Sequence, residues 1–259
     1  MQNIIVNVLD VQNFFLIFVR VTSMLFFLPI FDSRVIPVIF KAGLSLAMSL
    51  LLFHYLSPTI HLADPLGPVP LVLGVAGEVF MGAGIALSVK LILAGVQLAG
   101  QLAGFQMGLA IANVVDPLTS EQSSETAMVL NLFAMLVFLA VDAHHWFLRA
   151  LAASFEQVGP LSLHLSPSFV ESLLTLSGAM FVIAIKVAAP IIAALLLTSA
   201  ALGLVARTVP QMNIFIVAFP LKIMVGFLLM ALSLPYISSY LSELFHTFGR
   251  ELVLMFSGL

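Results

Sequence analysis

Six charged side chains lie inside long apolar stretches of the sequence, where charges are rare. They are Arg20, Glu78, Lys90, Asp142, Lys186 and Lys222. A charge in the apolar part of a membrane costs about 2.5–3.5 kcal/mol on insertion scales, so each marks a candidate site such as a proton or ion relay. The alternative is structural pairing between helices or subunits. Two acids against four bases favour pairing, because a relay more often uses a lone carboxylate.

Two of these charges are too far apart to neutralise each other locally. Glu78 and Lys90 are twelve residues apart, which is about 18 Å along a straight helix. We therefore expect each of them to have its partner on another helix.

A row of glycines follows the second of these charges. Gly100, Gly104 and Gly108 recur at every fourth position, so they share one face of a helix and let another backbone approach closely. Gln97 and Gln101 share a neighbouring face. The pattern fits a tight helix contact strengthened by amides as well as it fits the wall of a hydrated path.

Asp142, His144 and His145, directly before Trp146, could hold a metal ion or exchange protons. Adjacent histidines on a helix point about 100° apart, however, and cannot easily share one ion. The HExxH spacing of zinc proteases is also missing. We therefore favour a cluster at the membrane interface, with Trp146 as the aromatic residue of the belt.

The motifs of other catalytic classes are missing as well. The sequence has no GxSxG motif, and Gly82 and Gly84 are not followed by the lysine of a phosphate-binding loop. It has no cysteine, which excludes disulfides, thiolate metal ligands and cysteine nucleophiles. The sequence therefore predicts no enzyme, no catalytic residue, no cofactor and no metal site.

The composition decides what kind of scaffold must position these residues. Of 259 residues, 62% are apolar and 8% are charged, and the mean hydropathy is +1.20. Such a chain cannot cover itself with polar groups, and its apolar runs do not alternate as in a membrane barrel. The fold is therefore expected to be all-α, a set of membrane-associated helical hairpins in contact with lipid. A net charge of −3 without a basic patch excludes a nucleic-acid partner.

Apolar runs and proline positions predict the helices. We expect them at residues 8–31, 38–55, 71–109, 126–157, 168–206 and 214–248. The third is too long for one straight span, so we expect it to bend or break near its glycines. We expect Pro190 to kink the fifth helix, and Pro220 and Pro235 to interrupt the sixth. Residues 113–125 form the most polar stretch and are expected to be a loop.

Three blocks of this sequence resemble the flagellar biosynthetic protein FliR family. The most specific is the VPQMN…FP block, which lies between Arg207 and Lys222. The others are GFQMG at residues 104–108, followed by Asp116-Pro117, and FLAVDAHH at residues 138–145. The resemblance extends over nearly the whole chain. It departs at Asp142-Ala143, where the family often has Asn-Gly.

The resemblance implies a role in protein export. FliR proteins form, with FliP and FliQ, a channel of the flagellar type III export gate through which unfolded flagellar proteins pass. FlhB and FlhA lie next to it, in the bacterial inner membrane at the flagellar basal body. The resemblance also implies a FliP-like part, residues 1–160, joined to a FliQ-like part, residues 161–259.

The family is thought to place a pore plug in the loop after Met107. The matching residues of this chain are Phe105, Gln106, Met107, Leu109, Ile111, Val114, Val115 and Asp116. Family members can carry aromatic side chains here, whereas this chain has smaller ones at positions 111, 114 and 115. An apolar loop can still close a pore by excluding water.

A secondary transporter of a small solute is the alternative from another class. Its binding site would lie where helices are discontinuous, at Pro190 and Pro220. Such a transporter would work without partner proteins.

Overall fold

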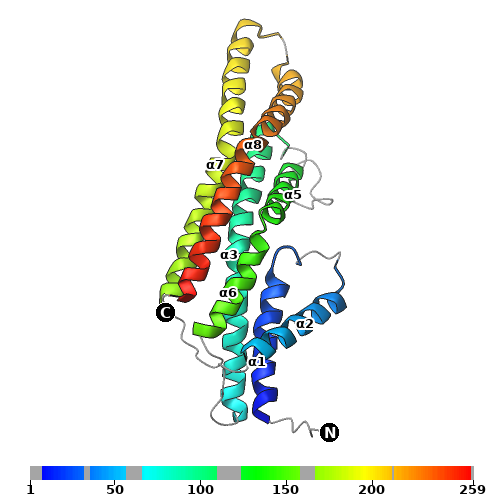
Figure 1. The fold of residues 1–259 in the computed structure, drawn as a ribbon. Coiled ribbons are helices and arrows are strands. Elements are labelled where there is room, and N and C mark those ends of the chain that lie inside the picture. The colour runs from blue at the N-terminus through cyan, green and yellow to red at the C-terminus, as the bar shows by residue number, and fades with distance from the viewer. Residues whose placement is uncertain are drawn as a thin grey trace. The chain divides into compact units, whose positions relative to one another are not determined.

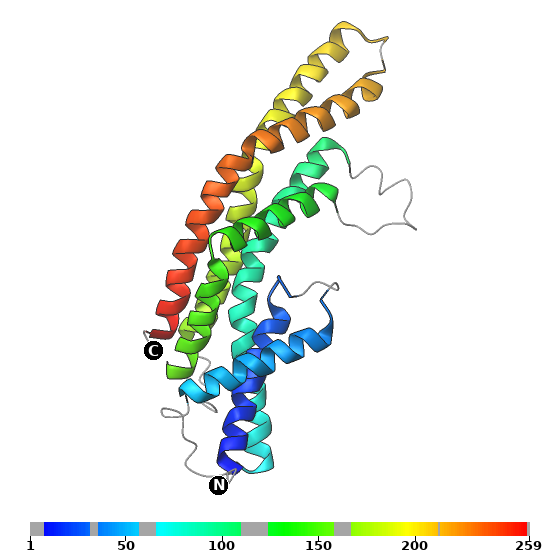
Figure 2. The same cartoon turned by 45° about the vertical axis from the view of Figure 1, so that its right-hand side comes forward.

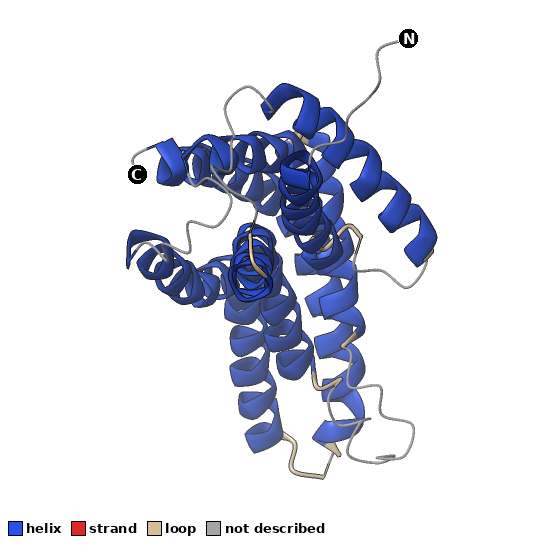
Figure 3. Cartoon of the chain, turned by 90° about the horizontal axis from the view of Figure 1, so that it is seen from below, coloured by secondary structure: helices blue, strands red, loops and turns tan. Residues whose placement is uncertain are grey.

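The computed structural model describes residues 8–31, 36–56, 66–109, 124–157, 167–211 and 213–257. Within these ranges the chain forms helices and turns and no strand (Figures 1 and 3), which confirms the all-α class. The helices are α1 Val8–Phe27, α2 Val38–Leu56, α3 Pro68–Met107, α5 Glu125–Ala140, α6 Ala143–Gln157, α7 Pro167–Thr208 and α8 Ile214–Ser257.

Five of these helices are long and apolar enough to cross a membrane, namely α1, α2, α3, α7 and α8. The count is six if the bent pair α5 and α6 forms one span. A helix satisfies its own backbone hydrogen bonds, which is why helices can enter a medium without water. The composition and the helix content therefore agree on a membrane protein.

Helix α3 is continuous over 40 residues, so of the two predicted alternatives, a bend or a break near its glycines, the break is wrong. One interior glycine costs a helix only about 1 kcal/mol, which close packing at the glycine can offset. The predicted helix at residues 126–157 is instead two helices, because Asp142 adopts φ 54°. Aspartate is one of the few residues that tolerate this left-handed conformation.

The prolines also do not end their helices. Helix α7 continues through Pro190, and α8 continues through Pro220 and Pro235. The expected interruption of the last helix is therefore wrong. A proline removes one donor from the helix and crowds the preceding turn, but the hydrogen bonds on either side can keep the segment helical.

The chain divides into two compact units that interleave along the sequence. The first contains residues 1–90, 142–175 and 246–259, and the second contains residues 91–141 and 176–245. This division by packing differs in kind from the expected FliP-like and FliQ-like parts, which stay a prediction.

The first unit packs the α1–α2 hairpin, the start of α3 and helix α6. Leu16, Val21 and Met24 of α1 are fully buried in its core. Phe14 and Phe53 join α1 to α2 through an edge-to-face ring contact with centroids 5.8 Å apart.

The second unit packs the end of α3 against α5, α7 and α8. In two views α7 and α8 lie side by side as a long hairpin (Figures 1 and 2). Gly95 faces α7, where a Cβ atom would lie 2.8 Å from the Met180 carbonyl oxygen. Gly100 faces the start of α5, where a Cβ atom would lie 2.8 Å from the backbone nitrogen of Ala127. The glycines of α3 therefore let two neighbouring backbones approach on different sides.

Substituting Gly100 with alanine should destabilise the chain by about 1–3 kcal/mol, because the added methyl group overlaps the backbone of α5. Gly178 is the matched control, since it lies within α7 with no atom within 4 Å of its Cβ position. There Gly178→Ala should stabilise by about 0.5–1 kcal/mol, through the better helix propensity of alanine. Thermal unfolding in detergent measures both. Equal shifts for the two variants would contradict the packing at Gly100.

Candidate functional site

The carboxyl end of α3 is closed by a glycine in a left-handed conformation. Gly108 has φ +87°. Its N–H donates to the Phe105 carbonyl at 3.0 Å, and the Leu109 N–H donates to the Gly104 carbonyl at 3.1 Å. This pair of bonds is the Schellman motif, which satisfies carbonyls at a helix end. The spacing of the glycines predicts only helix packing for Gly108, although a glycine at the end of a periodic stretch is also a known signal of a helix end.

The start of α5 is fastened to the same part of α3. The Thr126 hydroxyl donates to the Gly100 carbonyl at 2.7 Å, and the hydroxyls of Thr126 and Ser124 lie 2.5 Å apart. A Cβ atom at Gly104 would lie 2.5 Å from the Ser124 hydroxyl. Residues 104–109 and 124–126, which flank the expected plug loop, are therefore held together by direct contacts.

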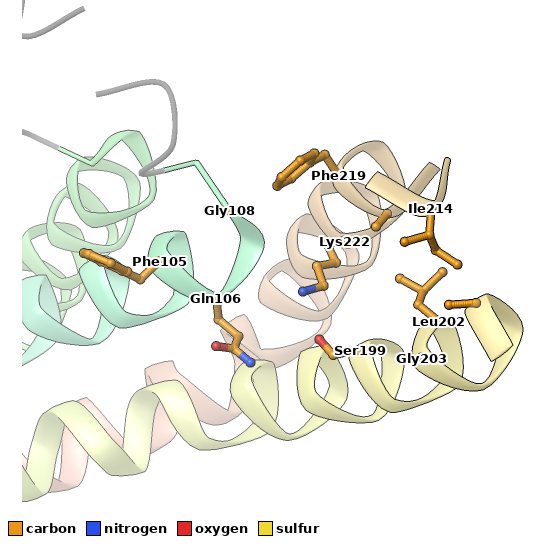
Figure 4. A pocket seen from close by; sticks show the side chains of 11 residues that line it. Phe105, Gln106, Gly108, Ser199, Leu202, Gly203, Ile214, Phe219 and Lys222 are labelled. Carbon is orange, nitrogen blue, oxygen red and sulfur yellow. The ribbon is translucent and has the colours of Figure 1, made fainter. Parts of the chain in front are cut away.

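Beside this helix end lies an open cleft of about 400 Å³ (Figure 4). Its walls come from the end of α3, from α7 and from the first turns of α8. They are formed by Phe105, Gln106, Gly108, Ser199, Leu202, Gly203, Ala206, Ile214, Ala218, Phe219 and Lys222. Most of these side chains are apolar or small. Gln106, Ser199 and Lys222 supply the polar atoms and point into the same part of the cleft.

The residues expected to plug a pore have different surroundings. Phe105 is 75% exposed, while Met107 is fully buried and its side chain packs on Gly226 of α8. Gln106 lines the cleft, and Leu109 is half-buried. The other members of the expected plug lie outside the described residues, namely Ile111, Val114, Val115 and Asp116.

Glu78 has an arginine on another helix as its partner. The Arg20 Nε and Nη2 atoms donate to the two carboxylate oxygens of Glu78, the second at 3.0 Å. Arg20 Nη1 also donates to the Ser154 carbonyl at 2.9 Å and to its hydroxyl at 3.1 Å, and the guanidinium lies 4.1 Å from the ring centre of Phe155. This cluster joins α1, α3 and α6 within the first unit.

The geometry of this cluster is that of a structural ion pair. Arg20 is 1% exposed and Glu78 is 2% exposed. Arginine and carboxylate groups pair most strongly through two parallel hydrogen bonds, as here. Both carboxylate oxygens of Glu78 accept from Arg20 and both residues are buried, as expected of a charge pair that joins helices. No sequence signal identified Ser154 and Phe155 as its neighbours.

The remaining charges of the apolar stretches lie nearer the surface of the single chain. Lys90, Lys186 and Asp142 are exposed, and Lys222 is half-buried in the wall of the cleft. The Lys186 ammonium lies 5.3 Å from the ring centre of Tyr240, which is a cation–π distance.

The two adjacent histidines converge, contrary to our expectation. The ring centres of His144 and His145 are 4.2 Å apart. Asp142 Oδ1 lies 3.9 Å from His144 Nε2 and 3.6 Å from His145 Nδ1. Both histidines lie in the first turn of α6, so an angle of about 100° between successive side chains still lets their rings meet. Trp146 packs on Gly249 of α8.

The Arg20 cluster gives a stability prediction. Arg20→Met should destabilise the chain by about 3–5 kcal/mol, because it leaves the Glu78 carboxylate buried without a partner. The double variant Arg20→Met/Glu78→Met should recover much of that loss, since no charge is then stranded. Chemical or thermal unfolding in detergent measures the series.

Arg149→Met is the matched control for this series. Arg149 is exposed, with its guanidinium 5.2 Å from the ring centre of Trp146, so its loss should cost about 1 kcal/mol or less. A double variant as unstable as the sum of its two single variants would show that Arg20 and Glu78 act independently.

Comparison with known proteins agrees with this architecture. Residues 11–248 match the family described as bacterial export proteins, family 1. The flagellar biosynthetic protein FliR of Pectobacterium carotovorum subsp. carotovorum is 35% identical over 243 residues, which cover 91% of this chain and 89% of that protein. FliR of Bacillus subtilis strain 168 is 32% identical over 231 residues, covering 86% of each chain. FliR of Escherichia coli K12 is 29% identical over 231 residues, 87% of this chain and 85% of that protein.

These matches extend over nearly the whole chain and include both of its compact units. They confirm the resemblance that the VPQMN…FP block indicated. The chain therefore belongs to family 1 of the bacterial export proteins, with the FliR proteins among its relatives.

Proposed function

We propose that this chain is a subunit of the flagellar type III protein export gate. With FliP and FliQ it forms a channel through which unfolded flagellar proteins are exported, next to FlhB and FlhA. Its place is the bacterial inner membrane at the flagellar basal body. The observation that carries this proposal is the match of residues 11–248 to the export family, together with full-length relatives named FliR.

The exposed apolar and charged surface of the chain supports contacts with partner proteins. Only 17% of the apolar segment in α2, and 17% of that in α8, is buried within the chain. Lys186 is exposed on α7, which is apolar enough to cross a membrane. A charge on such a helix is unfavourable against lipid and is normally turned toward protein or water. Neighbouring gate subunits supply that surface.

The end of α3 supports the proposed plug. The described residues on both sides of the loop are anchored, by the Schellman motif at Gly108 and by the Thr126 hydroxyl. Anchored ends limit how far an apolar loop can move from a pore axis. Phe105 adds an exposed ring at the same place.

The transporter alternative loses its structural argument. It required discontinuous helices at Pro190 and Pro220, with unwound backbone to coordinate a solute. Both helices are continuous through these prolines.

Purification from native membranes tests the proposal. A tagged copy of the chain should elute in a stable complex with FliP-type and FliQ-type proteins, because its apolar and charged surfaces need protein neighbours. Size-exclusion chromatography and mass spectrometry identify the components. A monodisperse single chain that transports a small solute in vesicles would refute the gate function.

Removing the apolar loop should open the closed channel. Deletion of residues 109–115 should raise leakage of ions or small solutes, because the seal depends on these side chains excluding water. A second variant replaces residues 110–115 with Gly and Ser at equal length, which preserves the Leu109 N–H that closes α3. The same replacement at residues 158–163 is the control. Unchanged leakage in both loop variants would refute the plug.

A further inference from the structure

We infer that the cleft at the end of α3 receives an apolar helix of a separate membrane protein, and that a carboxylate on this helix pairs with Lys222. The inference rests on the proposed function in one respect, because it requires a membrane protein neighbour. It adds the chemistry of that neighbour and the place where it docks.

The inference begins with Lys222, whose ammonium group has no counter-charge among the described residues. This lysine lies within the apolar segment Ile216–Leu252 of α8 and is half-buried in the cleft wall. Within the ranges that the structure describes, no hydrogen bond or ion pair reaches its ammonium group, and none of the described residues lining the cleft is acidic. An ionisable group at apolar depth is normally paired, so Lys222 calls for an anionic partner.

The polar atoms around Lys222 suit a carboxylate. The Gln106 amide and the Lys222 ammonium point into the same part of the cleft (Figure 4). Each can donate a hydrogen bond to one carboxylate oxygen. The Ser199 hydroxyl already donates to the Leu195 carbonyl at 2.7 Å, so it contributes polarity to the wall without competing as a donor.

The shape of the cleft suits a helix. Ser199 and Gly203 are four residues apart on α7, and Ala206 and Ala218 continue the small lining. No atom lies within 4 Å of the Cβ position of Gly203, as is also true of Gly178, but Gly203 in addition lines the cleft. Small residues spaced by four let a second helix backbone approach closely in a membrane. The packing of Gly203 is therefore open on the side where another helix fits.

Charge and shape together favour a protein segment over a small anion. A small anion would pair with Lys222 but would leave the apolar walls of the cleft uncovered. A helix that carries one aspartate or glutamate among apolar residues would pair with the lysine and cover these walls. About 400 Å³ of open cleft accommodates side chains of such a helix.

Site-specific photo-crosslinking in native membranes tests this docking. A benzophenone side chain in place of Leu202, on the cleft wall, should crosslink to an apolar segment with an acidic residue in another membrane protein. The control position is Leu197, which is 73% exposed on α7 and does not line the cleft. Adducts at position 202 only with lipid, with residues 110–123 of the same chain or with a second copy would overturn the inference, as would no adduct.

Charge exchange then tests the ion pair. Lys222→Glu should lower recovery of the crosslinked partner by about tenfold or more, and Lys222→Met should also lower it, because the partner carboxylate is stranded. Lys222→Arg should retain binding. Replacing the partner acid with lysine should restore recovery in the Lys222→Glu background. Arg149→Glu, at an exposed arginine of α6 outside the cleft, is the control.

Thermal unfolding of each variant in detergent separates lost docking from lost folding. If Lys222→Glu and Lys222→Met fold and still recover the partner at the normal level, the ion pair is refuted while the gate function stands. If the paired protein lies outside the export gate, the docking stands and the assignment of this cleft to a gate neighbour is refuted.

Discussion

A charged group surrounded by apolar atoms needs a counter-charge, and this requirement divides the ionisable residues of the chain into two sets. Arg20 and Glu78 meet it internally, through two parallel hydrogen bonds between α1 and α3. Ser154 and Phe155 complete the arginine's surroundings from α6. The pair therefore specifies which helices of the first unit lie together, since apolar contacts alone discriminate poorly between neighbours of similar size.

The glycines also fall into two sets, those packed against another helix of the chain and those without a neighbour. Helix α7 fills the space beside Gly95 and helix α5 fills the space beside Gly100, so both glycines pack within the second unit. Gly203 of α7 has nothing within 4 Å of its Cβ position and lines the cleft that contains Lys222. A glycine costs a helix stability unless close packing offsets the loss. Gly178 is open in the same way, so what distinguishes Gly203 is its position in the cleft beside Lys222, where the proposed partner helix would dock.

The sequence predicts the helical class well because composition and apolar runs act locally. The sequence does not predict the break at Asp142. Aspartate also occurs within helices, so this residue alone does not signal a left-handed backbone. The sequence identifies Glu78 and Arg20 as charges at apolar depth but cannot choose among four bases for the partner. The continuous α3 excludes the predicted break, because glycines spaced by four mark helix contacts as readily as helix breaks.

The choice of base at each place fits its task. Arginine in the first unit has a planar group whose donors match both oxygens of Glu78, so the pair is fixed in one geometry. Lysine in the cleft has a compact ammonium on a flexible stem, whose three donors can be directed at an arriving group from several angles. In the proposed gate subunit the two charges have different tasks. The rigid pair fixes the helices of the chain, and the flexible lysine would tolerate the adjustments that docking requires.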